Sequence, residues 1–228
     1  MRIDAVQRDT PTPLEQSWNY GEAVNAASFN KVRRGIVEID GAPVATLQTA
    51  ERRLPFGINM VRLTRGPVTA QADLLPDIAQ AVRREYPRWS RHLLFWMPDT
   101  VHATEPMRSI GKRPMTTGYT TAWLDLAPEE TQLRRNLRGN WRNALNRAQD
   151  DDTVTRVSWR MQDVEPFIAQ YVRDRKARKY SGPSANFVHI LAENFGRDVV
   201  LVRALDHGDA IAASLFLRHG TSATYYLS

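Results

Sequence analysis

LRRNLRGNWRNALNRAQ, residues 133–149, is the stretch from which the rest of this sequence is best understood. An apolar residue recurs every four positions, which on an α-helix forms one continuous stripe, at Leu133, Leu137, Trp141 and Leu145. Arginines follow at the same spacing, one residue later and about 100° around the helix, at Arg134, Arg138 and Arg142. No acidic residue occurs among the five arginines of the stretch. The pattern predicts one helix with a basic ridge beside an apolar seam that faces the core.

The composition is that of an ordinary folded protein with an excess of positive charge. The 228 residues suit one large domain or two domains of about 110 residues each. Hydrophobic residues make up 42% and charged residues 25%, which is enough apolar material for a sizeable core. The formal net charge is +6 and the isoelectric point is about 9.9. This charge suits an acidic partner, which can be a nucleic acid, a phosphorylated ligand or an anionic membrane surface.

Several functional classes are excluded by residues that the sequence lacks. It has no cysteine, which excludes disulfides, thiolate metal sites and a cysteine nucleophile. The five histidines do not have the spacing of a metal motif, and no GxSxG sequence marks a serine hydrolase. Residues 1–13 contain no apolar signal segment, and no window approaches 18 uninterrupted apolar residues. We therefore expect a cytoplasmic protein without a metal site or a transmembrane segment.

The first half of the sequence predicts the order α-β-β-β-α-β-β. Asp40-Gly41 between two β-rich runs is a strong hairpin signal, and Pro87 ends the second helix. The residues between 98 and 118 are predicted to form a loop. The other predicted elements are helices over 14–28 and 73–86, a hairpin over 35–48, and strands over 58–64, 92–97 and 119–126.

The second half begins with the helix that carries residues 133–149. Pro128, Glu129 and Glu130 precede it, and proline and acidic residues are favoured in a first helical turn. Gly196 closes a later helix. The remaining predicted elements are strands over 154–159, 199–205, 210–218 and 221–227, with helices over 164–179 and 186–195.

An internal repeat divides the chain into two units. VEIDGAPVATLQ (37–48) and VRALDHGDAIAASLFL (202–217) are both predicted hairpins that follow a helical segment and precede a further strand. We therefore predict two related α/β units, at 1–126 and 127–228. The first unit continues with a turn, a helix and two strands, and the second does not, so we expect the second unit to be incomplete.

Four segments carry a resemblance to a known family. Residues 133–149, with the preceding WLDLAPEE (123–130), resemble the signature helix of the FemAB-like acyltransferases. These are the aminoacyl-tRNA-dependent peptidoglycan-bridge enzymes and their acetyltransferase-like relatives. Three further segments agree with the family in the expected order, and they are QSWNYGEA (16–23), RLTRGPV (62–68) and AASLFLRHGTSATYYLS (212–228).

The resemblance implies a mixed α/β fold of two tandem GNAT-like units and an N-acyltransferase activity that requires a complete second unit. In this family an acyl or aminoacyl group passes from an activated donor, an acyl-CoA or an aminoacyl-tRNA, to an amine, commonly on a cell-wall precursor. The donor is a co-substrate, so no permanently bound cofactor is expected. An anionic precursor and a tRNA both suit the positive charge. The chemistry consists of positioning an amine and stabilising an oxyanion, which needs no dedicated nucleophile.

Seven residues are candidates for substrate binding, and no catalytic residue is assigned. Arginine can bind phosphate or carboxylate bidentately, and basic residues also gather near the end of the helix over 164–179. Adjacent residues of a strand point to opposite faces, so one tyrosine of the pair at 225–226 is predicted to lie in the core and the other is a candidate to line a cleft. The candidates are Arg138, Arg142, Arg147, Lys179, Tyr180, Tyr225 and Tyr226.

A non-catalytic basic module that binds nucleic acid or an anionic surface is the alternative. The arginines would contact phosphates, although no helix-turn-helix, zinc or RRM signature accompanies them. Trp141 beside the basic ridge would also suit peripheral contact with a membrane. For any single arginine, a solvated helix face is the simpler interpretation.

Overall fold

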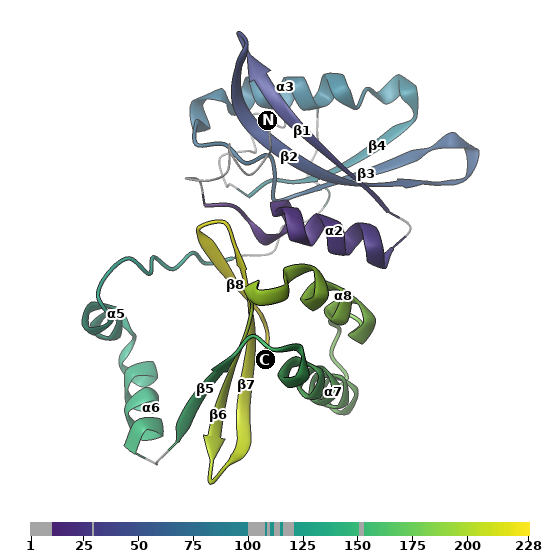
Figure 1. The fold of residues 1–228 in the computed structure, drawn as a ribbon. Helices are drawn as coiled ribbons and strands as arrows, with labels where there is room; N and C mark the ends of the chain where they lie inside the picture. Colours follow the sequence, from purple (N-terminus) through teal and green to yellow (C-terminus); the bar gives the residue numbers. More distant parts are fainter. Residues whose placement is uncertain are drawn as a thin grey trace.

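The computed structural model describes residues 11–28, 30–99, 108, 110–111, 115, 121–150 and 153–228. Over these residues the chain forms two four-stranded sheets and six α-helices, so the predicted mixed α/β class is confirmed. Helices α2 (Trp18–Ala27) and α8 (Ala185–Phe195) lie between the two sheets (Figure 1). In the described part of the chain, no helix has both the length and the apolarity needed to cross a bilayer.

Sheet A is formed by the first half of the chain, in the order β1-β2-β3-β4. The first three strands are antiparallel, and β4 is parallel to β3. A parallel pair needs a crossover connection, and α3 (Leu75–Glu85) provides it. The strands are β1 (Lys31–Ile39), β2 (Ala42–Arg53), β3 (Asn59–Thr64) and β4 (His92–Met97), and short 3-10 turns lie at Pro55–Gly57, Ala72–Leu74 and Arg88–Ser90.

Sheet B has the order β5-β6-β7-β8 and is antiparallel throughout. Helices α7 (Met161–Arg178) and α8 connect β5 to β6 and pack on one face of the sheet. The strand pattern β6-β7-β8 repeats that of β1-β2-β3. The strands are β5 (Val154–Ser158), β6 (Val199–Asp206), β7 (Asp209–His219) and β8 (Ser222–Leu227), with a 3-10 turn at Gly196–Asp198 before β6.

The two repeated hairpins have the same kind of turn. Asp40 and Gly41 have φ values of 51° and 78°, and His207 and Gly208 have values of 50° and 95°. Two successive residues with positive φ are characteristic of the type I′ turn, whose twist matches that of the flanking strands. The Asp40-Gly41 hairpin predicted from the sequence is confirmed.

Two apolar cores lie on the two sheets, and α2 connects them. The first core lies between sheet A and α3, and it includes Leu63 and Ile78. The second lies between sheet B and helices α7 and α8, but it also includes Leu14 and Ala23 from the N-terminal segment. The 3-10 turn η1 (Leu14–Gln16) and the start of α2 are also hydrogen-bonded to β2 and β3, so this segment joins both sheets. The division of the chain after residue 126 stays a prediction.

The stretch 133–149 is not one helix, contrary to the prediction. It forms α5 (Glu130–Asn136) and α6 (Gly139–Asp150), separated by Leu137, which has extended backbone angles of −60° and 140°. Glycine and asparagine are weak helix formers, and they surround this break. Arg142 Nη1 donates a hydrogen bond to the carbonyl oxygen of Arg135 (3.1 Å), which satisfies a terminal carbonyl of α5.

The apolar stripe of this stretch faces solvent, so the expected core-facing seam is wrong. Trp141 is 66% exposed, and Leu137 and Leu145 are each 38% exposed. Helices α5 and α6 lie beside sheet B on the side away from α7 and α8 (Figure 1). The two helices are held to each other by polar contacts, so the apolar side chains are left without a cover.

The strand predicted over 119–126 is also wrong. Thr121–Leu126 contains no strand, and residues 119 and 120 lie outside the described residues. Asp125 accepts a hydrogen bond from the amide of Ala127 (3.0 Å), which turns the backbone just before Pro128. Most of the loop predicted over 98–118 also lies outside the described residues.

Candidate functional site

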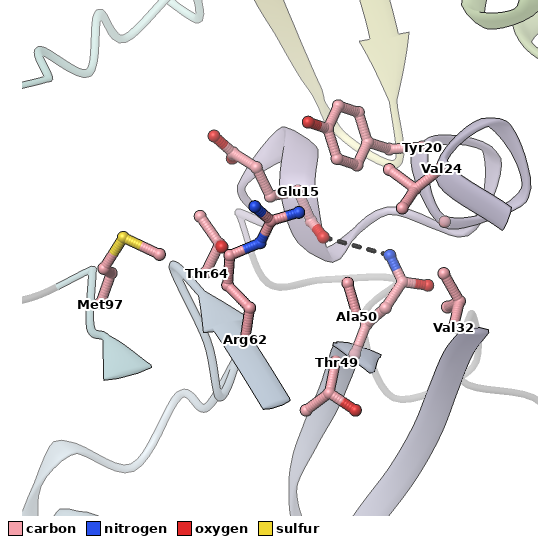
Figure 2. Close-up of a pocket in the computed structure, with 11 residues that line it drawn as sticks. Glu15, Tyr20, Val24, Val32, Thr49, Ala50, Arg62, Thr64 and Met97 are labelled. Atoms are coloured by element: carbon pink, nitrogen blue, oxygen red, sulfur yellow. Dashed lines mark hydrogen bonds between the residues drawn. The ribbon is translucent and has the colours of Figure 1, made fainter. Parts of the chain in front are cut away.

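A cavity lies where sheet A meets the N-terminal segment. Its volume is about 320 Å³, and Figure 2 shows acidic, basic and phenolic side chains gathered around it. Residues from η1, α2 and all four strands of sheet A contribute to its wall. They are Glu15, Tyr20, Gly21, Val24, Val32, Gln48, Thr49, Ala50, Arg62, Thr64 and Met97.

Two buried glutamines fix the N-terminal segment to sheet A. Gln16 Nε2 donates to the carbonyl oxygens of Gln48 (3.1 Å) and Thr64 (2.6 Å), and Gln16 Oε1 accepts from the Gln48 amide (2.8 Å). Gln48 Nε2 in turn donates to the carbonyl oxygens of Glu15 (3.1 Å) and Ser17 (3.0 Å). Because buried amides are costly unless they are hydrogen-bonded, this pair holds η1 and the start of α2 firmly in place. The pair thereby positions Glu15 and Tyr20 in the cavity wall.

A glycine allows α2 to approach this amide pair closely. A Cβ atom on Gly21 would lie 2.1 Å from Gln48 Oε1 and 2.6 Å from an Arg34 nitrogen. The same Gln48 oxygen accepts a hydrogen bond from Arg34 Nε (2.7 Å). Glycine lowers the helix propensity of α2 at position 21. The structure shows that the close approach of Gln48 to α2 leaves no room for a side chain at this position.

The cavity contains both signs of charge. Arg62 on β3 is exposed and forms no ion pair or hydrogen bond with any residue that the structure describes. A Glu15 carboxylate oxygen lies 3.6 Å from Arg65 Nη1, and Arg65 Nε also contacts Asp99 (2.5 Å). Arg62 is therefore the cation available to an anionic ligand, and Glu15 is the nearby acid.

Two tyrosines near the cavity keep their protons. Burial, and secondarily Glu15, raises the pKa of Tyr20 to about 12, while Arg62 acts in the opposite direction. Burial also raises the pKa of Tyr226 on β8 well above its ordinary value, with further contributions from Tyr20, Tyr171 and Glu15. Both hydroxyls are therefore neutral at physiological pH and available as hydrogen-bond donors.

His219, at the end of β7, connects the cavity region to sheet B. It is buried, and Nε2 lies 2.8 Å from Thr224 Oγ1. Burial and, secondarily, the nearby Arg65 lower the pKa of His219 to about 4, against an opposing effect of the Thr12 backbone. His219 also lines a second cavity of about 670 Å³, together with residues such as Trp18 and Arg218.

Three of the four segments that carry the family resemblance meet at this junction. Segment 16–23 contributes Tyr20 and the Gln16 clamp, and segment 62–68 contributes Arg62. Segment 212–228 contributes Tyr226, whose pKa responds to Tyr20. In the fourth segment, residues 133–149 line neither cavity, and Leu126 of the preceding 123–130 lines the second one.

The fold resembles that of known structures, although the sequence does not match known families. No protein-family model matches the chain, and no curated protein matches its sequence. The structure titled FemX superposes with a TM-score of 0.70 at 14% identity, over 90% of this chain and 57% of that one. A conserved protein of unknown function from Bacteroides thetaiotaomicron VPI-5482 gives 0.55 at 10% identity, over 94% and 71%. The chain therefore shares the fold of FemX and spans about 57% of its length.

A third structure is similar to a lesser degree. It is the C-terminal DUF2156 domain of a putative lysylphosphatidylglycerol synthetase from Agrobacterium fabrum, with a TM-score of 0.49 at 12% identity over 94% of this chain and 64% of that one.

Of the arginines predicted to bind substrate, Arg142 and Arg147 lie on α6 and Arg138 lies in the break before it, and all three are away from both cavities. Arg138 and Arg147 are exposed, whereas Arg142 donates to the Arg135 carbonyl and stabilises the helical hairpin. Their role in binding phosphate or carboxylate stays a prediction, and the structure does not bring them to the cavity.

The other candidates fall into two groups. Lys179 ends α7 with a left-handed φ of 53°, and the Tyr180 ring lies 6.4 Å from that of Tyr171, one of the neighbours of Tyr226. Tyr225 is 57% exposed on the opposite face of sheet B. The predicted opposite orientation of Tyr225 and Tyr226 is confirmed, and Tyr226 is the one that packs against the core.

Sequence reasoning missed Glu15, Tyr20, Gln48 and Arg62. Tyr20 and Arg62 lie in segments that mark the family resemblance, which was the available signal for them. Gln48 has no such signal, because its partner Gln16 lies 32 residues away and neither residue belongs to a catalytic motif.

Proposed function

We propose that this chain belongs to an acyltransferase that moves an acyl or aminoacyl group to an amine, and that the acceptor binds in the cavity beside α2. The observation that carries the proposal is the grouping of Glu15, Tyr20 and Arg62 around one cavity, in a chain with the fold of FemX. This chain spans about 57% of the length of FemX, so an activity like that of a whole protein is itself part of the proposal. The FemAB-like resemblance of the sequence makes an amine on a cell-wall precursor the preferred acceptor.

Arg62 binds the anionic part of the acceptor in this proposal. Its guanidinium lines the cavity and has no partner among the described residues. Guanidinium binds phosphate and carboxylate through two parallel hydrogen bonds, which are among the strong polar interactions in proteins. A phosphorylated or carboxylate-bearing precursor therefore matches this wall of the cavity.

Glu15 and Tyr20 act on the reacting groups. The amine nitrogen attacks the carbonyl carbon of the donor, a C–N bond forms, and the C–O bond of an aminoacyl-tRNA or the C–S bond of an acyl-CoA breaks. Glu15 accepts the proton that the amine loses, as a general base, and this proton then passes to the departing oxygen or sulfur. The neutral Tyr20 hydroxyl donates a hydrogen bond to the carbonyl oxygen as negative charge develops there.

Acceptor binding by the whole chain tests the proposal. A UDP-linked muramyl peptide with a free side-chain amine is titrated into the protein by calorimetry. Losing a hydrogen bond to a charged group weakens binding by about 10- to 100-fold, and this is the loss expected for Arg62→Ala. The control is Arg156→Ala, which removes an exposed arginine of β5 that lines neither cavity. Unchanged affinity in the Arg62→Ala protein would overturn the assignment.

Acyl transfer is measured separately with labelled aminoacyl-tRNA and acyl-CoA as donors. Transfer to the peptide amine that is lost in Glu15→Gln supports the proposed roles. RNA or DNA binding with a steep salt dependence, without acceptor binding or acyl transfer, would instead support the basic binding module.

A further inference from the structure

The α5–α6 hairpin has exposed apolar side chains, whereas a helix at the protein surface usually turns such side chains toward the core. Trp141 is 66% exposed, and Leu137 and Leu145 are each 38% exposed. Trp141 and Leu145 lie four residues apart on α6 and share one face of that helix, and such a face normally packs on a core, while Leu137 lies at the break before α6. The segment before α5 adds Trp123 and Leu124, which are 53% and 75% exposed. Tryptophan and leucine are thus concentrated at the surface of one part of the chain.

The arginines of the hairpin divide into two groups. Arg134 Nη2 donates to Gln149 Oε1 (2.8 Å), and Arg142 Nη1 donates to the Arg135 carbonyl (3.1 Å), so these two arginines hold the helices together. Arg135, Arg138 and Arg147 are exposed, and none of the three forms an ion pair with a described residue. No acidic residue occurs between positions 131 and 149, and the next acidic residues, Asp150 to Asp152, begin three positions after Arg147.

We propose that the α5–α6 hairpin docks on the surface of a bilayer that contains anionic phospholipids. Leu137, Trp141 and Leu145 would enter the interface, where tryptophan is favoured because its ring is both apolar and a hydrogen-bond donor. Arg138 and Arg147 would contact the headgroups. The described helices are too short or too polar to span the bilayer, so the contact is peripheral.

The apolar side chains favour a membrane over a nucleic acid as the partner. Phosphates of either partner would attract Arg138 and Arg147, but a double-stranded nucleic acid offers no apolar phase to cover the two exposed leucines and Trp141. A bilayer interface binds both kinds of side chain at once. The inference does not depend on acyl transfer, because the hairpin shares no residue with the proposed acceptor cavity.

Vesicle flotation with the whole chain tests the charge requirement. We expect binding to vesicles of phosphatidylcholine mixed with phosphatidylglycerol and weak binding to phosphatidylcholine alone. Each arginine near an anionic surface contributes about fivefold, so the double variant Arg138→Gln/Arg147→Gln should bind about 25-fold more weakly. The matched control is Arg83→Gln/Arg84→Gln, which removes the same charge from an exposed part of α3. Equal losses in both proteins would overturn the proposal, because they would reflect net charge alone.

Trp141→Ala tests the apolar requirement without changing the charge. We expect it to weaken vesicle binding about tenfold or more. Trp141→Phe should retain most of the binding, and it shows whether the alanine variant has failed for lack of a folded hairpin. Wild-type affinity in the Trp141→Ala protein would overturn the proposal. So would tight binding to an RNA oligonucleotide by a protein that ignores anionic vesicles.

Discussion

The two sheets share a strand pattern but differ in how their faces are covered. In sheet A, six consecutive residues of β2, Val44–Thr49, are buried, because α3 covers one face and the N-terminal segment covers the other. In sheet B, helices α7 and α8 cover one face, while Val157 and Tyr225 on the other are 53% and 57% exposed. The proposed acceptor cavity lies on the doubly covered sheet. The same arrangement of strands therefore leads to different surfaces, and the covering elements decide which of them forms a site.

The N-terminal segment, which covers the second face of sheet A, is held there by polar contacts. Gln16 and Gln48 hold it by side-chain amide hydrogen bonds, and only part of the space is filled, which leaves the cavity. The helices on sheet B instead pack by apolar contact, and the second cavity, at the β7–β8 end of that sheet, is lined by no residue of α7 or α8.

Leucine-to-alanine substitutions in the two cores give the largest expected effect. Leu63 on β3 and Leu201 on β6 are both fully buried. Removing either side chain should lower the free energy of unfolding by about 3 kcal/mol, within the usual range of about 2–5 kcal/mol for such cavities. Because α2 packs in the core of sheet B and its start is hydrogen-bonded to sheet A, we expect one common transition in urea, followed by circular dichroism and tryptophan fluorescence. Two separate transitions, each shifted by only one variant, would show that the sheets unfold independently.

Buried His219, the last residue of β7, should make the stability of the fold depend on pH. The pKa of buried His219 falls from 6.5 to about 4 on folding, whereas His207 lies exposed in the β6–β7 turn. His219 therefore stabilises the fold fully above pH 6.5, and this contribution is lost as the pH falls to about 4, since the unfolded chain binds the proton first. The loss amounts to about 3 kcal/mol.

The measurement is the free energy of unfolding in urea between pH 7 and pH 4. His219→Gln should flatten its pH dependence in this window. Parallel pH profiles for wild-type and His219→Gln proteins would contradict burial of a neutral histidine at the junction.

A reciprocal exchange of turn residues should give the smallest effect. Asp40 and His207 occupy the same left-handed position of the two type I′ turns, and aspartate is favoured there over histidine. His207→Asp should stabilise the protein by about 0.5 kcal/mol, and Asp40→His should destabilise it by a similar amount. Thermal unfolding of both variants measures the difference. Shifts of the same sign would show that the two turns are not equivalent.

The sequence predicts best those features that depend on neighbouring residues. The Asp40-Gly41 turn and the Gly196 helix end are local, and both are found in the structure. The break at Leu137 was missed because the four-residue apolar period continues through it, although Gly139 weakens the helix there. Periodicity reports which side chains share a face, but it does not report whether another element covers that face.

The candidate site was harder to predict because long-range contacts define it. Gln16 reaches Thr64 across 48 residues, and the hydrogen bonds of Gln48 depend on this approach. The resemblance to FemAB-like proteins pointed to the segments that contain Tyr20 and Arg62 without indicating that they meet. The arginine-rich stretch attracted attention by its composition, yet it lies on a different surface from the cavity.

The attachment of α2 to both sheets restricts how the cavity can change its shape. Many binding clefts open and close by rotation of two bodies about a hinge. Here one wall is anchored to sheet A by the Gln16–Gln48 amides, and the same segment places Leu14 and Ala23 in the core of sheet B. Rotation of the sheets about this segment would break either buried hydrogen bonds or apolar packing. We therefore expect ligands to be admitted by rotamer changes of wall residues such as Arg62, on the nanosecond scale of exposed side chains, and not by slow domain closure.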